Sequence, residues 1–161
     1  MKGGNVGTSA NMWLVDSTGK QINGDSDISS RKRSIDLRSI EHNVHSPYDP
    51  QTGKNTSRRI HAPFTIIKNI DSVTPIFNKA CCNGEQLKEA MIALYRINQN
   101  GSEEQYFRYY FNEIKVVNVA PMIHCSMGEA DCESVSFIYG NIKWEYIEDN
   151  IAHEDSWLLR A

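Results

Sequence analysis

Apolar and polar residues alternate along several short segments of this chain. In the segment 34–42, Ile35 and Leu37 fall on one face and polar residues fall on the other. A period of two is typical of a strand that buries one face. Ile40 is out of phase with this alternation, which indicates a bulge or the end of the strand.

Similar alternation, or a run of aromatic and β-branched residues, predicts further strands. The stretch 87–97 also fits a helix with one apolar stripe, but the turn signal at 98–101 favours a hairpin and therefore a strand. The strands predicted in this way are 11–15, 60–67, 87–97, 104–119 and 134–148, with a short edge strand around 27–29 and a final docked strand in the polar tail 150–161, which ends on the apolar residues 157–159.

Two of these strands carry signs of interruption. The polar residues Asn112 and Glu113 lie inside the longest strand and indicate a bend or bulge. Pro121 is expected to end that strand, since proline has no amide proton for a ladder hydrogen bond. The alternation changes parity at Gly140-Asn141, which predicts a glycine bulge.

One helix is predicted, and it begins at Thr74-Pro75. Threonine can cap the free amide groups of a first helical turn, and proline suits the first helical position. Asn83-Gly84 is expected to end the helix. Its apolar stripe is formed by Ile76, Phe77, Ala80 and Cys81.

These elements add up to about seven or eight short strands and one helix. This pattern predicts a mainly β fold, α+β at the margin, built as a small barrel or sandwich with the helix alongside. A chain of 161 residues is the usual size of one domain. We expect a flexible, glycine-rich tail at 1–10 and a single domain at 11–161.

The most unusual segment is a long polar connection, 43–59, between two predicted strands. Compact domains seldom contain a connection of this length unless it has a function or is disordered. Because both ends enter strands, we interpret the segment as an arm held at its two ends. The function expected of such an arm is contact with another molecule.

Composition and charge exclude few functions. A net charge of −3 favours neither nucleic acid nor an anionic membrane as a partner, and the basic run Arg31-Lys32-Arg33 is interpreted as a solvated turn. No apolar run is long enough for a membrane-spanning helix, and residues 1–10 lack the apolar core of a cleavable signal peptide. The four cysteines form no disulfide framework, so they are interpreted as reduced thiols of a cytosolic product.

No catalytic, cofactor-binding or metal-binding motif is apparent. His42, His45 and His61 surround the arm, but their spacing does not match a metal site, and hydrogen-bonded histidines are the simpler interpretation. His124 and Cys125 are adjacent in sequence, which does not define a nucleophile with its base. We therefore expect no catalytic residue, no metal and no cofactor. A β-barrel hydrolase that uses these histidines remains a remote alternative.

The chain resembles a known family over about residues 11–161. It is similar to the haemolysin-coregulated proteins (Hcp), the tube subunits of bacterial type VI secretion systems. The segments that carry the resemblance are Glu41-His42-Asn43, Thr52-Gly53-Lys54, Arg59-Ile60-His61-Ala62-Pro63-Phe64, Lys68, Ile70-Asp71, Pro75, Tyr95-Arg96-Ile97-Asn98, Gly101, Tyr106-Phe107, Lys115-Val116-Val117, Pro121, Ile142-Lys143-Trp144 and 150–157.

The resemblance implies a two-sheet barrel with one helix and a protruding loop, whose copies form hexameric rings that stack into a hollow tube. It implies a non-enzymatic protein that is made in the bacterial cytoplasm and then expelled by a contracting sheath, without a cleavable signal peptide. The implied partners are other copies of the chain, a spike protein, sheath proteins and effector proteins in the lumen. The alternative is a ring that serves mainly as a receptor and chaperone for effectors.

Two groups of site residues follow from the resemblance. The arm is the candidate surface for ring stacking, and Pro47 and Pro50 are expected to stiffen it. The polar face of the strand 34–42 is the candidate lumen or interface face, with Asp36, Arg38 and Glu41. The candidate stacking residues are Asn43, Pro47, Tyr48, Asp49, Thr52, Gly53, Lys54, Arg58 and Arg59.

Overall fold

Strands dominate the chain, and one helix accompanies them, so the prediction of a mainly β fold is confirmed. The structure is a computed structural model that describes residues 9–123 and 131–157. The helix α1 spans Thr74–Asn83, and a 3-10 turn, η1, spans Ser29–Arg31. The strands are β1 Ser9–Val15, β2 Gln21–Ile22, β3 Ile35–Glu41, β4 Val44–His45, β5 Ile60–His61, β6 Phe64–Asn69, β7 Gln86–Ile97, β8 Glu103–Met122, β9 Cys132–Ile138, β10 Asn141–Tyr146 and β11 Ile151–Ser156.

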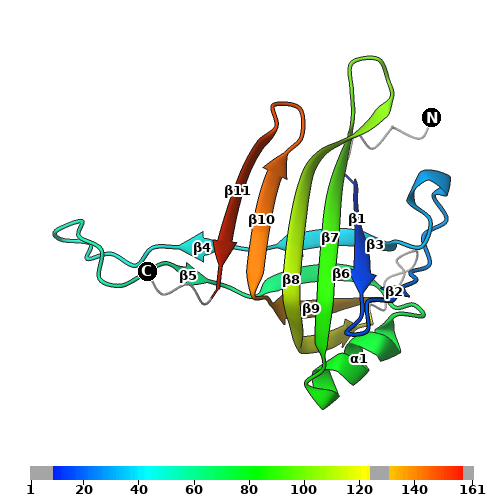
Figure 1. Cartoon of the computed structure of the whole chain (residues 1–161), viewed down its shortest axis with the longest axis horizontal. Coiled ribbons are helices and arrows are strands. Elements are labelled where there is room, and N and C mark those ends of the chain that lie inside the picture. Colours follow the sequence, from blue (N-terminus) through cyan, green and yellow to red (C-terminus); the bar gives the residue numbers. More distant parts are fainter. Residues whose placement is uncertain (1–8, 124–130, 158–161) are drawn as a thin grey trace.

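Nine of the eleven described strands pair in one sheet that closes on itself, and β4 and β5 form a separate pair. The order of the sheet is β11-β10-β8-β7-β1-β3-β6-β9, β2 pairs with β1, and β9 pairs again with β8. This second pairing closes β8, β7, β1, β3, β6 and β9 into a barrel, while β10 and β11 continue the sheet beside it (Figure 1). The two sheets predicted for the barrel are therefore joined into one. No helix in the described ranges is long and apolar enough to cross a membrane.

The long strand β8 belongs to both parts of this sheet. Its first half pairs with β10, its second half pairs with β9, and β7 runs along its other edge. The partner of β8 changes from β10 to β9 at Glu113. The positive φ of Glu113, 52°, bends the strand at the position where the sequence predicts a bend. Gly140 approaches this bend, and its amide nitrogen donates to the carbonyls of Asn112 and Glu113 at 2.9 and 3.1 Å. The glycine bulge predicted at Gly140-Asn141 is thus wrong in kind, because Gly140 lies in the connection from β9 to β10 and Asn141 begins β10.

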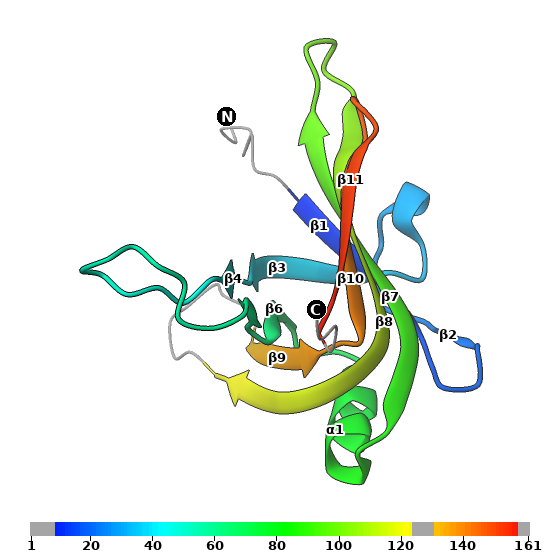
Figure 2. The ribbon, with the colours of Figure 1, turned by 60° about the vertical axis from the view of Figure 1, so that its left-hand side comes forward.

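The core fills the barrel and is rich in aromatic rings. Phe64 on β6 packs against Phe111 and Phe137, with ring centroids 4.8 and 5.4 Å apart. Helix α1 covers one end of the barrel beside β8 (Figure 2). It buries Phe77 and Ala80, whereas Ile76 of the predicted stripe is exposed. The apolar stripe of the helix is therefore narrower than expected.

Several predicted boundaries differ from the structure. The strand expected at 60–67 is divided into β5 and β6, because the chain leaves the arm at Ala62-Pro63 and enters the barrel only at Phe64. Pro121 does not end β8, which continues to Met122. The final strand predicted in the tail 150–161 is present as β11, Ile151–Ser156, and residues 158–161 of that tail lie outside the described residues. Of the predicted tail, residues 1–8 lie outside the described residues, while Ser9 and Ala10 belong to β1.

The predicted edge strand around 27–29 is wrong, because Arg31 points inward and bends the chain into the 3-10 turn. Its side chain is 1% exposed. The guanidinium donates to Asn11 Oδ1 at 2.8 Å and lies 3.5 Å from the centre of the Tyr95 ring. It also forms an ion pair with Glu103. The run 31–33 is therefore only partly a solvated turn.

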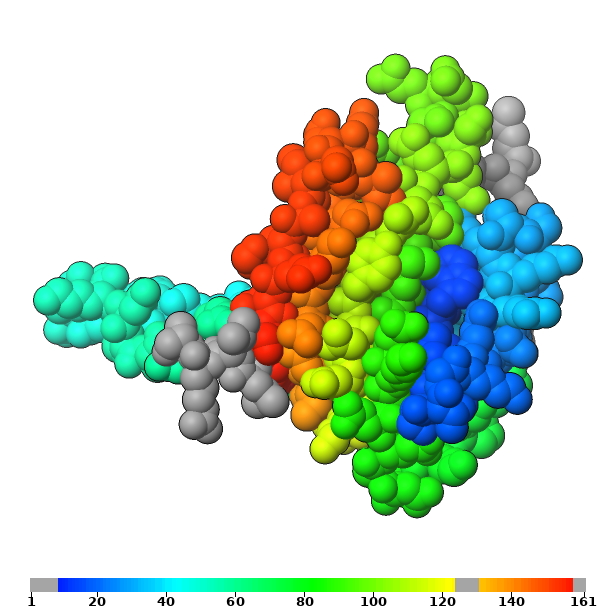
Figure 3. All heavy atoms as spheres, viewed as in Figure 1, coloured from blue at the N-terminus to red at the C-terminus, as the bar shows by residue number. Residues whose placement is uncertain are grey.

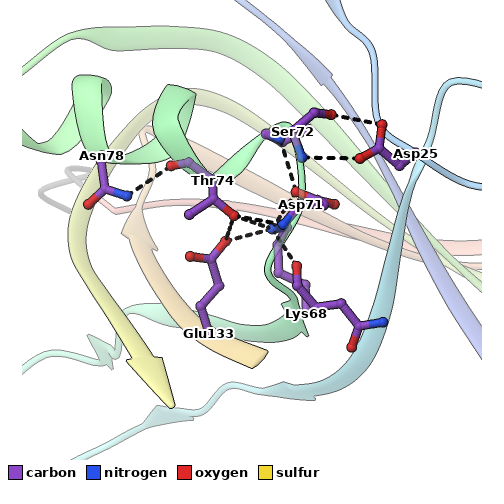
Figure 4. Close-up of polar contacts among 9 residues, drawn as sticks. Asp25, Lys68, Asp71, Ser72, Thr74, Asn78 and Glu133 are labelled. Carbon is purple, nitrogen blue, oxygen red and sulfur yellow. Dashed lines mark hydrogen bonds and ion pairs between the residues drawn. The ribbon is translucent and has the colours of Figure 1, made fainter. Parts of the chain in front are cut away.

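A buried ion pair joins the end of β6 to the start of β9 (Figure 4). The side chains of Lys68 and Glu133 are both 0% exposed, and Lys68 Nζ lies 2.5 Å from Glu133 Oε1. Lys68 also donates to Asp71 Oδ1 at 2.8 Å. Thr74 donates to Glu133 Oε1 at 2.7 Å and so does not cap the helix as predicted. These bonds fix the start of α1 against the barrel.

Candidate interaction surface: the arm and its root

The arm, residues 43–59, projects away from the barrel (Figure 3). Its two limbs pair at the base, where β4 and β5 are antiparallel and the amide of Ala62 donates to the carbonyl of Asn43 at 3.0 Å. They meet again further out through a bridge between Tyr48 and Asn55. The arm is therefore a narrow, ordered ribbon.

A compact turn closes the outer end of the arm, and Asp49 organises it. The amide of Asp49 donates to the carbonyl of Lys54, and the amide of Gly53 donates to the carbonyl of Asp49, both at 2.8 Å. Asp49 Oδ1 accepts a further bond from the amide of Gln51 at 2.8 Å. Among the described residues, the hydrogen bonds of 46–58 all stay within the arm.

The arm leaves apolar side chains exposed to solvent. Tyr48 and Val44 are 64% and 38% exposed, and Ile60, which directly follows the arm, is 46% exposed. Single exposed apolar residues are common on protein surfaces, but here they sit on a ribbon that has solvent on most sides. A projecting ribbon with exposed aromatic and aliphatic groups is suited to contact another molecule.

The root of the arm is attached to the barrel through a chain of side-chain hydrogen bonds. The hydroxyl of Tyr139, between β9 and β10, lies 2.9 Å from His42 Nε2 and 2.7 Å from His61 Nδ1. His61 Nε2 lies 2.7 Å from Asp155 Oδ2 on β11. Arg59 binds the same carboxylate with two nitrogens, Nη2 at 2.7 Å and Nε. We call these five residues the root network.

Aromatic rings enclose the root network. The His61 ring lies 5.7 Å from Trp157 and 6.4 Å from Trp144, and the Tyr139 ring lies 5.1 Å from Trp157. The His61 side chain is only 2% exposed, so its two hydrogen bonds are shielded from water and are stronger than on an open surface. His42 and His61 thus have the role of hydrogen-bonded histidines, as the sequence indicates.

The electrostatics of the root network favour one arrangement of charge. The two bonds from Arg59 lower the pKa of Asp155 to about 2, so this carboxylate is ionised over the ordinary pH range. Burial, together with the positive charge that His61 can carry, lowers the pKa of His42 to about 4, so His42 is neutral at pH 7. Burial also raises the pKa of Tyr139, which keeps the hydroxyl proton in place.

The lowered pKa of His42 makes the stability of the subunit depend on pH. An unfolded chain protonates this histidine near pH 6.5, whereas the folded chain does so only near pH 4. The unfolded state therefore binds more protons in this window, and the free energy of unfolding falls as pH decreases from 6.5 to 4. We expect a loss of about 2 kcal/mol, after allowance for the partial exposure of the ring.

Urea unfolding at a series of pH values measures this loss. A His42→Gln variant removes the titrating group and serves as the control, so its stability should change less between pH 6.5 and 4. Equal slopes for the two proteins would contradict the assignment of the effect to His42.

The candidate stacking residues divide into two groups. Pro47, Tyr48, Asp49, Thr52 and Gly53 lie in the outer part of the arm, together with Lys54 and Arg58. Asn43 and Arg59 instead lie at the root, where Asn43 pairs through its backbone and Arg59 binds Asp155. Arg59 therefore anchors the arm.

The candidate lumen or interface residues lie on the outward face of β3, as the alternation predicts. Asp36, Arg38 and Glu41 are all exposed. Asp36 Oδ1 accepts hydrogen bonds from Asn11 Nδ2 at 2.6 Å and Ser26 Oγ at 2.8 Å, so it is fixed in position. Their role stays a prediction.

The structure also shows where the other candidate chemistry lies. His45 is exposed on β4, away from the root network. The described residues contain no group of three or more metal-ligating side chains. Cys81, Cys82 and Cys132 are unpaired, while His124 and Cys125 lie outside the described residues.

Comparison with known proteins places the chain in a family. The family model described as "Type VI secretion system effector, Hcp" matches residues 12–146. This chain belongs to the Hcp family. The resemblance identified from the sequence is therefore confirmed.

Individual relatives support this assignment. The "Major exported protein" of Pseudomonas aeruginosa is 28% identical over 126 residues, which cover 75% of this chain and 73% of the relative. A variant of the Hcp1 protein from the E. coli EAEC 042 pathovar has a similar structure, with a TM-score of 0.85, 38% identity, and coverage of 92% and 98% of the two chains. The secreted protein Hcp3 from Pseudomonas aeruginosa shares the fold at 22% identity, with a TM-score of 0.78 and coverage of 94% and 99%.

Proposed function

We propose that this chain is a structural, non-enzymatic tube subunit of a type VI secretion system. Six copies form a ring, and rings stack into a hollow tube in which the arm of each subunit contacts the next ring. The observation that carries this proposal is the ordered arm, which projects from the barrel and exposes apolar side chains. Membership of the Hcp family supports the secretion role.

A closed ring with head-to-tail contacts needs two different surfaces on each subunit. The outer strand β11 offers one such surface, since it pairs only with β10 among the described residues. The arm offers a second surface at a different place on the molecule. A tube that assembles and later dissociates is better served by modest, mixed contacts than by one large apolar patch, and the arm has this mixed character.

The remaining partners follow from the role of a tube. We propose that a contractile sheath surrounds the stacked rings and expels them, that a spike protein covers their end, and that effectors travel in the lumen. The protein would be made in the cytoplasm and exported without cleavage of a signal peptide. The exposed polar side chains of β3, Asp36, Arg38 and Glu41, are our candidates for the lumen or subunit-interface face.

Negative-stain imaging of the purified protein, together with sedimentation velocity, tests the ring directly. We expect six-fold rings and a species near six times 18.3 kDa. A protein that stays monomeric at high concentration and turns over a substrate would contradict the proposal.

Deletion of Pro47–Lys54 tests the role of the arm. We expect a folded subunit that still forms rings but no longer stacks, because the hydrogen bonds of the removed residues to other described residues all stay within the arm. A second variant replaces 47–54 with a glycine-serine linker of equal length, and it should also fail to stack if the shape of the turn matters. Imaging and tube length are the measurements, and tubes of normal length from the deletion variant would refute this role.

A further inference from the structure

We propose that Tyr139, His61 and Asp155 are positioning residues that fix the direction of the arm and thereby set how readily rings stack. This inference rests on the proposed function, since it assumes that the arm contacts the next ring. It assigns a purpose to the root network that is separate from the stability of the barrel.

The bonds within the arm give it a shape but not a direction. Its paired positions are few: β4 with β5, and the bridge between Tyr48 and Asn55. A two-stranded ribbon of this size is marginally stable alone and can swing about its base. Whatever holds the direction of the arm must therefore act at the root.

Tyr139 connects both limbs of the arm to the barrel. His42 precedes the outgoing limb and His61 belongs to the returning limb, and a single hydroxyl lies within 3 Å of both rings. A hydroxyl has one proton to donate and lone pairs to accept, so it can donate to one imidazole and accept from the other. The Tyr139 side chain thus fixes the separation of the limbs and their position over the barrel.

Asp155 provides a second point of attachment, on the outer strand β11. Arg59 Nε, Arg59 Nη2 and His61 Nε2 all bind its carboxylate, so two residues of the returning limb converge on it. Bidentate bonds between guanidinium and carboxylate are directional as well as strong. With Tyr139 on one side and Asp155 on the other, the returning limb cannot rotate without breaking charged or buried bonds.

A fixed direction matters for assembly because every immobilised group costs entropy on docking. An arm that already points toward the next ring loses little freedom when it binds. A swinging arm would have to be ordered in each of six subunits, so small effects per subunit multiply over a ring. Loss of the root network should therefore weaken stacking much more than it weakens the ring.

Tyr139→Phe and Asp155→Asn test this inference with near-isosteric changes. Tyr110→Phe is the matched control. Tyr110 lies on β8 opposite β10, and among the described residues its hydroxyl accepts only one long hydrogen bond, from Arg108 at 3.4 Å. Stacking is measured as the lowest protein concentration that gives tubes, ring formation by sedimentation, and folding by thermal unfolding. Arm motion is measured by the fluorescence anisotropy of a dye attached through an encoded azide at position 51.

We expect each root variant to raise the concentration needed for tubes at least tenfold and to lower the dye anisotropy, while rings still form. Arg59→Lys, which keeps the charge but not the two-nitrogen geometry, should give an intermediate effect, and Tyr110→Phe should match the wild type. Tube formation within twofold of wild type, unchanged anisotropy, or equal loss in Tyr110→Phe would overturn the inference.

The outcomes also separate this inference from the proposed function. Wild-type rings that never stack contradict the proposed function, and the anisotropy of the dye still decides whether the root network holds the arm. Variants that lose the ring itself overturn the inference, because the network would then act on the subunit contact and not on the arm.

Discussion

Glu133→Ala is expected to lower the free energy of unfolding by about 3–5 kcal/mol, and the melting temperature by about 10 °C or more. The side chains of Lys68 and Glu133 are both 0% exposed. Truncation of the Glu133 carboxylate therefore leaves the Lys68 ammonium buried in the barrel wall without its buried counter-charge. Asp71 would remain as its charged partner, 2.8 Å away, but it lies nearer the surface. Chemical and thermal unfolding measure this loss.

Two further variants define the cause of this loss. Lys68→Met combined with Glu133→Leu removes both charges and should recover much of the lost stability, since apolar residues of similar volume often replace a buried ion pair without penalty. Glu145→Ala is the matched control, because the ion pairs of Glu145 with described residues are both 3.4 Å long and join it to the partly exposed Arg108 and Lys143. Its loss should stay below about 1 kcal/mol. A Glu133→Ala variant as stable as this control would contradict the argument.

Gly24→Ala is expected to cost about 3 kcal/mol or more, because the chain packs too closely there for a side chain. A Cβ atom at position 24 would lie 2.2 Å from the carbonyl oxygen of Ser34 and 2.8 Å from the backbone nitrogen of Ile35. These are backbone atoms at the start of β3, so relief requires the strand to move. The hydroxyl of Ser34 bonds Asn11 at 2.9 Å, and the shift would also disturb the buried Arg31 cluster.

Gly53→Ala is the control for this second prediction. Gly53 has a φ of +70°, but a Cβ atom there would meet no other atom within 4 Å. It should cost only the strain of alanine in that conformation, about 1 kcal/mol. Urea unfolding of the two variants measures the difference, and equal losses would show that close packing at Gly24 is not the cause.

Much of the fold could be predicted from local patterns. The turn signal at 98–101 correctly favoured a hairpin over a helix for 87–97, and the amide of Gly101 bonds Asn98 in that turn. The polar pair Asn112-Glu113 correctly marked the bend of β8. These features depend on neighbours in sequence, which is why a single chain reveals them. The long polar connection indicated the arm, and the family resemblance favoured a barrel over a sandwich.

Contacts between distant residues could not be predicted in this way. His61 and Arg59 lie at the arm in the sequence, but their partners are distant in the chain. Tyr139, which bonds His61, and Asp155, which bonds Arg59, are about 80 and 100 residues away. Nothing local pairs a tyrosine after β9 with a histidine on β5. The anchoring role of Arg59 was missed for this reason, and Arg59 was grouped with the outer arm residues.

The alternation along β6 itself predicts the buried ion pair. Lys68 has the same parity as Phe64 and Ile66 on β6, so the alternation itself places a lysine inside the barrel. A cation at an inward position requires a buried partner of opposite charge. Glu133 carries the same signal, because it shares the parity of the buried Val135 and Phe137 on β9, and it lies opposite Lys68 in the sheet.

The continuous course of β8 bears on how the subunit responds to mechanical load. Along one edge, residues 103–115 of β8 pair with β7, and along the other edge the strand pairs with β10 at 107–112 and then with β9 at 115–122. A force along this strand loads many backbone hydrogen bonds in shear at the same time. These bonds therefore have to break together and not one after another. Under the proposed expulsion by a contracting sheath, the subunit would resist this load through one polypeptide segment that ties β10 and β11 to the barrel.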